Sequence, residues 1–254
     1  MAPVLIVAVF GLFIGSFLNV CIHRIPRDKS IVWPASSCPK CSQPIKPWDN
    51  IPVLSYIILL GRCRGCREFI SPRYPLVEMM SSLFAVGLFL LFGQSASFVI
   101  YYVWACALLI ITFIDLDFQI IPDSLSIGGI VVGLCLVYWL PVTYKDALIG
   151  LFLGAGGLWA IIVVYYLLTG KEGMGGGDVK LLGMIGVFTG WHGVLYTIFM
   201  GSLIGSLIGV PWALINKKGM QAPIPFGPFL AMGALMYLFF GQDMINWYFG
   251  TITR

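Results

Sequence analysis

Long runs of apolar residues restrict the possible folds of this chain more than any other feature. A helix needs roughly 17–25 predominantly apolar residues to cross the hydrocarbon core of a bilayer. Seven runs are long enough: 3–22, 76–93, 97–115, 124–140, 147–168, 193–215 and 227–249. Only 10% of the residues are charged, against about 25% in soluble domains. The sequence therefore predicts an all-α polytopic membrane protein and excludes a soluble globular or a disordered one.

The positions of the lysines and arginines predict how often the chain crosses the membrane. Short loops that are rich in these residues stay on the cytoplasmic side. Thirteen of the fifteen lie in three polar segments, namely nine from Arg24 to Arg73, then Lys171 and Lys180, and finally Lys217 and Lys218. If all three segments are cytoplasmic, an even number of spans separates the last two, so 179–215 forms a helical hairpin. We expect about eight transmembrane helices with both termini outside.

Three parts of the chain follow from this pattern. Residues 1–23 form the first transmembrane helix, and no basic segment precedes it as in a cleaved signal peptide. Residues 24–75 form a small polar module on the cytoplasmic side. Residues 76–254 form a multi-helix membrane domain.

Four of the seven cysteines form two CxxC pairs in the polar module, namely Cys38, Cys41, Cys63 and Cys66. Two such pairs supply the four thiolates of a closed structural zinc site. A module of this size has too little core to fold alone, so the metal would supply folding energy. A redox-active CxxC pair or free thiols are the alternatives. The other three, Cys21, Cys106 and Cys135, are predicted to be small core residues.

Two aspartates at the ends of apolar runs are candidate catalytic residues. Asp115 ends one run, and Asp178 precedes another, so the predicted topology places both at the cytoplasmic membrane face. A carboxylate in a membrane segment suggests a function. Two facing carboxylates can perform acid proteolysis, in which an ionised one activates water and a protonated one polarises the scissile carbonyl. The alternative for Asp178 is a helix N-cap.

Residues near the two aspartates are candidates for active-site support or for purely structural roles. Asp117 is either active-site support or a solvated loop residue, and Asp123 is expected to start a helix. The glycines Gly175 and Gly177 leave room for an extended peptide. Lys180 either supports the site or anchors at the lipid headgroups.

The first span also carries polar residues. Ser16 and Asn19 lie three residues apart on one helix face, where they either hydrogen-bond to neighbouring helices or contact substrate.

A series of motifs in one order covers nearly the whole chain. They are GSFLNV at 15–20, HRIP at 23–26, the two CxxC pairs, PWDNIP at 47–52, RYPLVE at 73–78, IDLD at 114–117, IPD at 121–123, GKEGMGGGDVK at 170–180 and PIPFGP at 223–228. With these motifs the chain resembles the bifunctional type IV prepilin peptidases, which are leader peptidases and N-methyltransferases of type IV pilus and type II secretion systems.

The resemblance implies that Asp115 and Asp178 are an aspartyl protease pair of the GxGD type. Such enzymes lie in the bacterial inner membrane and cut prepilins or pseudopilins after a glycine at the cytoplasmic face. They then methylate the new N-terminus with S-adenosylmethionine. The methyl donor rests on the resemblance alone, because the sequence has no dinucleotide-binding fingerprint.

Two questions stay open at this point. Glu78 either pairs with Arg73 or holds the methyl donor. The residues by themselves also allow a proton-coupled transporter that uses the two aspartates as a relay, or a non-catalytic scaffold of a secretion machine. No nucleic-acid partner is expected.

Overall fold

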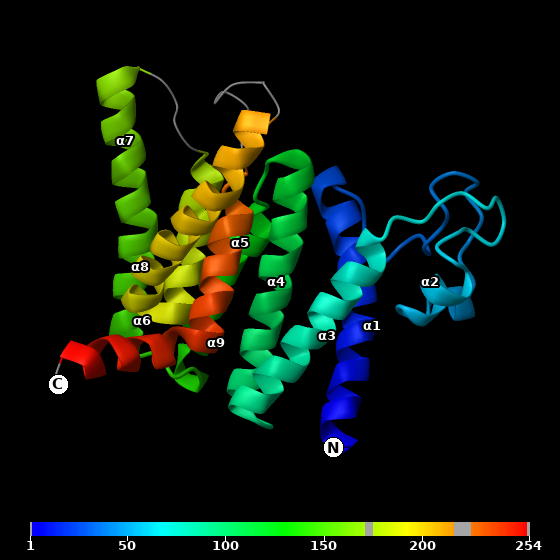
Figure 1. Cartoon of the computed structure of the whole chain (residues 1–254), viewed down its shortest axis with the longest axis horizontal. Coiled ribbons are helices and arrows are strands. Elements are labelled where there is room, and N and C mark those ends of the chain that lie inside the picture. The colour runs from blue at the N-terminus through cyan, green and yellow to red at the C-terminus, as the bar shows by residue number, and fades with distance from the viewer. Residues whose placement is uncertain (1, 171–174, 216–224, 253–254) are drawn as a thin grey trace. The chain divides into compact units, whose positions relative to one another are not determined.

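The regular elements of the chain are helices (Figure 1). The computed structural model describes residues 2–170, 175–215 and 225–252. In order, the elements are α1 (Ala2–Arg24), η1 (Ile25–Arg27), η2 (Pro47–Asn50), α2 (Leu54–Ile58), α3 (Arg73–Phe92), α4 (Ala96–Phe118), α5 (Asp123–Leu136), η3 (Val137–Trp139), α6 (Tyr144–Leu151), the π-helical turn η4 (Phe152–Gly156), α7 (Gly157–Thr169), α8 (Gly176–Ile215) and α9 (Gly227–Ile252). They form two compact units, Met1–Ile110 and Ile111–Arg254.

Close packing of α1 against α3 organises the first unit. Gly11 and Gly15 lie one turn apart on α1, and an added Cβ would come within 2.6 Å of Ser82 Cα and 2.5 Å of Glu78 Cα, respectively. Glycines at this spacing let two membrane helices approach backbone to backbone. The Ser82 hydroxyl also donates to the carbonyl of Ala8 at 2.9 Å. The two helices run antiparallel.

A break at Gly190 divides α8 into two arms. Its φ of 69° and ψ of −177° are not helical, and only glycine adopts this conformation readily. The first arm packs on α6, where Gly186 meets Gly150, and the second packs on α9, where Gly201 meets Phe229. Both ends of α8 lie on the same side of the unit in Figure 1. This agrees with the hairpin predicted for 179–215.

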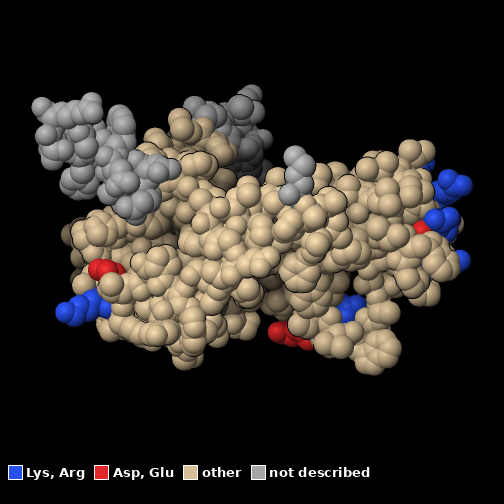
Figure 2. Space-filling view, turned by 90° about the horizontal axis from the view of Figure 1, so that it is seen from below, with Lys and Arg blue, Asp and Glu red and all other residues tan. Residues whose placement is uncertain are grey.

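Five helical segments are long and apolar enough to cross a membrane. They are Ala2–Arg27, Arg73–Phe92, Ala96–Phe118, Tyr144–Thr169 and Gly176–Gly209, and two shorter apolar helices cover Asp123–Trp139 and Gly227–Gly241. Most of the surface in Figure 2 is formed by uncharged residues, as a lipid environment requires. The predicted all-helical, multi-pass architecture is confirmed.

The cysteines outside the CxxC pairs differ in their environment. Cys21 and Cys106 are buried, as predicted, but Cys135 is exposed, so the prediction of a core residue is wrong there. Helix α5 packs through Gly133 against Val187 and Phe188 of α8. Two residues further on, about 200° around the helix, Cys135 faces away from that contact.

The contact between Gly150 and Gly186 gives a test of the second unit. An added Cβ at Gly186 would fall on the backbone of Gly150, whereas one at Gly157 meets no heavy atom within 4 Å. We expect Gly186→Ala to lower the free energy of unfolding by about 1–3 kcal/mol through overpacking. Gly157→Ala is the matched control and should leave it unchanged or slightly raised. Thermal unfolding in detergent measures both, and equal melting temperatures would contradict the packing.

Candidate active site and metal centre

The structure brings the two predicted catalytic aspartates together. Asp115 lies in the last turn of α4, and Asp178 lies in the first turn of α8, 63 residues later in the sequence. Both are buried, with 5% and 9% of their surfaces exposed. Their carboxylates are close enough for their charges to interact. Since α8 begins at Gly176, Asp178 is a helical residue and not the N-cap.

The start of α9 supplies a hydrogen bond that sequence reasoning missed. The backbone N–H of Gly227 donates to Asp115 Oδ2 at 3.1 Å. Gly227 is the first residue of α9, and a helix N-terminus stabilises a nearby negative charge. The PIPFGP motif points to this segment, but nothing in it reveals a partner 112 residues away. Positions 223 and 224 of that motif lie outside the described residues.

Two glycines pack around one side chain beside the aspartates. An added Cβ at Gly177 would lie 3.1 Å from Ile121 Cβ, and one at Gly227 would lie 3.4 Å from Ile121 Cδ1. The backbones before Asp178 and at the start of α9 therefore approach Ile121 closely. Gly177 thus has a packing role, whereas Gly175 is exposed and its carbonyl accepts from the Asp178 N–H at 3.2 Å.

An ion pair joins the N-terminal parts of α8 and α5. Lys180 follows Asp178 by two residues in the sequence, and its Nζ lies 2.7 Å from Asp123 Oδ1. Asp123 starts α5, as predicted. A lysine near the N-terminus of a helix interacts unfavourably with the helix dipole, and the pairing with Asp123 offsets this cost. Asp117 is exposed at the end of α4, as a solvated residue would be.

The other three predicted support residues lie between α1 and α3 in the first unit. Asn19 Nδ2 donates to the carbonyl of Tyr74 at 3.1 Å. Glu78 Oε2 accepts from the Val53 N–H at 2.8 Å, and the Ser16 hydroxyl also hydrogen-bonds to Glu78. Of the two alternatives for Ser16 and Asn19, hydrogen bonding between helices is the one these contacts support.

The four CxxC cysteines form one cluster. The sulfur atoms of Cys38, Cys41, Cys63 and Cys66 lie within 4.8 Å of one another. The separation between the sulfurs of Cys38 and Cys66 is 3.9 Å. A tetrahedral site with Zn–S bonds of about 2.3 Å places its sulfurs about 3.8 Å apart. The cluster therefore fits a four-thiolate zinc ion.

The two halves of the cluster have the same backbone hydrogen bonds. Cys38 N–H donates to the carbonyl five residues on, at 3.0 Å, and Cys63 N–H does the same at 2.9 Å. In the first turn, backbone N–H groups of Cys41 and Lys40 lower the pKa of the Cys38 thiol to about 7. A thiolate is the form that binds metal. Lys40 Nζ lies 3.7 Å from Glu68 Oε1, and this ion pair joins the turn at Cys38–Cys41 to the turn at Cys63–Cys66.

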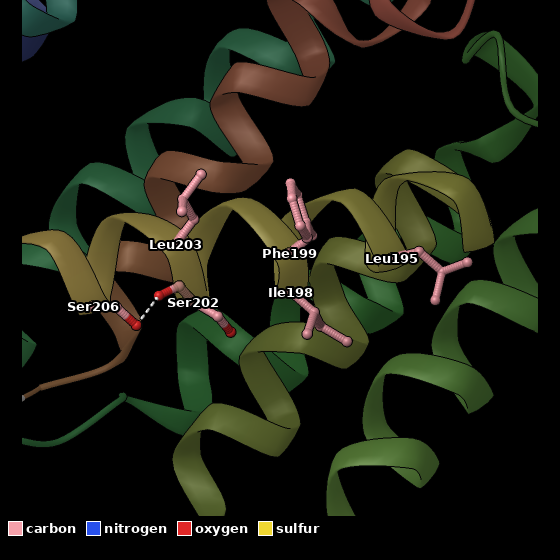
Figure 3. Close-up of a pocket in the computed structure, with 6 residues that line it drawn as sticks. All are labelled: Leu195, Ile198, Phe199, Ser202, Leu203 and Ser206. Atoms are coloured by element: carbon pink, nitrogen blue, oxygen red, sulfur yellow. Dashed lines mark hydrogen bonds between the residues drawn. The ribbon is translucent and has the colours of Figure 1, made fainter. Parts of the chain in front are cut away.

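Neither of two grooves in the described ranges is suited to S-adenosylmethionine. One groove on the second arm of α8 is lined by Leu195, Ile198, Phe199, Ser202, Leu203 and Ser206 (Figure 3). Its Ser206 hydroxyl is bound to the carbonyl of Ser202 at 2.7 Å. A second groove lies on α7, lined by Ala160, Ile161, Val164, Tyr165 and Leu168. Both are largely apolar, whereas an adenosine and an amino-acid carboxylate require several polar partners.

The fold and the site define a class: a helical multi-pass membrane protein with a buried aspartate pair and a four-cysteine cluster. Residues 9–92 match the bacterial peptidase A24 N-terminal domain, and residues 100–210 match the type IV leader peptidase family. The chain belongs to the type IV leader peptidase family.

Full-length relatives support this membership. The prepilin leader peptidase/N-methyltransferase of Aeromonas salmonicida is 38% identical, over 97% of this chain and 94% of the relative. Those of Aeromonas hydrophila and Pseudomonas aeruginosa are each 36% identical, over 96% and 98% of this chain and 92% and 94% of the relatives. No solved structure matches the chain. The resemblance drawn from the motifs is confirmed, and it argues against the transporter and scaffold alternatives.

The cysteine geometry predicts the metal content of the protein. Protein purified without chelators should carry about one zinc ion per chain. Cys38→Ser should lose it, because three thiolates bind zinc less tightly and the small module depends on the metal. Cys135→Ser, which changes an exposed cysteine of α5, is the control and should keep the metal. Elemental analysis measures both, and a metal-free wild-type protein would contradict the site.

Proposed function

We propose that this chain cleaves the leader peptide of type IV prepilins or type II secretion pseudopilins and methylates the new N-terminus. The relatives carry both activities in their names. The substrate is a membrane protein whose apolar helix lies among the spans while its leader remains in the cytoplasm. Cleavage follows a glycine at the cytoplasmic face.

One observation carries the peptidase assignment: Asp115 and Asp178, which are distant in sequence, meet in a buried site. Burying two carboxylates at one end of a membrane helix bundle is costly. A cost of this kind is typical of a functional site.

The hydrogen bond from Gly227 gives the two aspartates different roles. Asp115, whose Oδ2 accepts that bond, is the ionised general base, and Asp178 is the protonated acid. Asp115 takes a proton from water, whose oxygen attacks the carbonyl carbon, while Asp178 donates its proton to the carbonyl oxygen. On collapse the C–N bond breaks, the amine takes the proton from Asp115, and Asp178 recovers its own. No covalent intermediate forms.

We propose eight membrane crossings with both termini outside, so that the aspartates and residues 24–75 lie on the cytoplasmic side. The break at Gly190 supports this, because it turns 176–215 into two arms. The shorter helix of 14 residues at α5, extended by η3, supplies the fourth crossing. The distribution of lysines and arginines supports the orientation.

Residues can be assigned to only one of the two proposed cofactors. Zinc bound by Cys38, Cys41, Cys63 and Cys66 would be structural, since four thiolates leave no open position for water. S-adenosylmethionine would supply the methyl group. We assign no residue to it.

The peptidase proposal is tested by cleavage of a prepilin in membranes. Asp115→Asn and Asp178→Asn should each lower the rate at least about 10²-fold, because general acid–base catalysis contributes about 10²–10⁴-fold. Asp117→Asn, which changes the exposed carboxylate of the same helix, is the control and should keep cleavage. Thermal unfolding in detergent shows whether the variants fold. Retained cleavage in both single variants would overturn the aspartyl mechanism.

The role of Gly227 is tested separately. In Gly227→Ala the new Cβ would lie 2.6 Å from Asp115 Oδ2, so the carboxylate must move. Misplacement of a catalytic group by about 1 Å costs about 10²-fold in rate. Gly205→Ala is the control, because its Cβ lies in the same α8–α9 contact, 3.3 Å from the Phe229 ring. Similar kcat/KM values for the two variants would show that Gly227 does not position Asp115.

A further inference from the structure

Residues 53–60 of the first unit expose an apolar surface that neither the aspartate pair nor the cysteine cluster uses. Four large side chains in α2 and the turn after it are more than half exposed: Leu54 (52%), Ile57 (61%), Ile58 (65%) and Leu60 (82%). So many neighbouring apolar side chains in a polar module indicate a binding surface.

A hydrogen bond fixes the position of this surface along the axes of α1 and α3. The Val53 N–H, directly before α2, donates to Glu78 Oε2. Glu78 lies five residues into α3, about 7.5 Å along the axis from Arg73. It packs on Gly15 of α1, nine residues and about 13 Å before Arg24. Figure 1 accordingly shows α2 level with α1 rather than beyond its C-terminal end.

The net charge of the module that carries this surface complements anionic lipid headgroups. Residues 24–73 contain nine lysines and arginines but only three aspartates and glutamates. Arg24 donates to the carbonyls of Ser30 and Pro34, at 2.9 and 2.6 Å, and so holds a loop at the end of α1. That loop exposes 74% of Trp33. Basic residues and tryptophan are typical of the membrane interface.

We propose that residues 53–60 lie in the interface of the bilayer that α1 and α3 cross, with Leu54, Ile57, Ile58 and Leu60 inserted among the acyl chains. Phospholipid is the partner of this surface. Both ends of the module continue into membrane spans, so the surface is tethered at the bilayer and needs little intrinsic affinity for lipid. The proposal rests on α1 and α3 as spans, not on the cleavage chemistry.

Lipid photolabelling of the full chain tests the proposal. The protein is placed in nanodiscs of phosphatidylethanolamine and phosphatidylglycerol that contain a phospholipid with a photoactivatable acyl chain. Labelled residues are mapped by mass spectrometry. We expect label in 54–60 at a level comparable with exposed Leu83 and Leu90 of α3, and none at Lys40 or Arg64 of the cysteine turns.

Matched variants sharpen the test. Ile58→Asp should lower labelling of 54–60 at least about tenfold, because aspartate is strongly disfavoured among acyl chains. Ile58→Leu should leave it unchanged, and labelling of α3 should be constant in both. Leu60→Asp, outside α2, repeats the test if Ile58→Asp loses its zinc and so fails to fold.

Two results would overturn the proposal. One is an unlabelled 54–60 in wild-type protein whose α1 and α3 are labelled. The other is photocrosslinking from position 58 to a second copy of the chain or to added prepilin in place of lipid, which would make the partner a protein. Either result leaves prepilin cleavage, measured in the same nanodiscs, unaffected.

Discussion

The architecture of the second unit depends on burying two carboxylates at one end of a bundle of apolar helices. Buried carboxylates in a membrane helix bundle are largely shielded from bulk water, so the protein itself must supply partners for them. The start of α9 does so for Asp115 through one backbone N–H. Asp178 lies close enough to Asp115 for two negative charges to repel each other, so the two carboxylates behave as a pair.

Glycine makes these approaches possible without a soluble-type hydrophobic core. Between membrane helices the driving force is close packing, since lipid tails are as apolar as leucine. Gly15 of α1 packs against Glu78 of α3, and Gly186 of α8 packs against Gly150 of α6, so that the helix backbones approach each other closely. The same property appears at Gly177 and Gly227, where both backbones pack on Ile121. The glycines between helices and those beside the aspartates therefore serve one physical purpose, which is the close approach of backbones.

Much of this arrangement could be predicted from the sequence. The apolar runs predicted the helices, the CxxC spacing predicted the cysteine cluster, and charge placement predicted that Asp115 and Asp178 lie at the same end of the bundle. The partners of these residues could not be predicted, because Gly227 and the Lys180–Asp123 pair depend on which helices are neighbours. The prediction that Cys135 is a core residue was wrong for a related reason. A helix that is apolar on all sides has no polar face to show which side packs on protein.

The position of α2 within the cysteine module has an entropic consequence. Cys41 and Cys63 enclose 21 residues, and α2 lies inside this segment. A metal bound by all four cysteines closes that segment into a loop, which removes much of the conformational freedom its residues would otherwise have. The hydrogen bond between Val53 and Glu78 then forms within an already restricted loop, at a smaller entropic cost. Binding of a metal by these cysteines would therefore be thermodynamically linked to the attachment of α2 to α3, although the two share no atom.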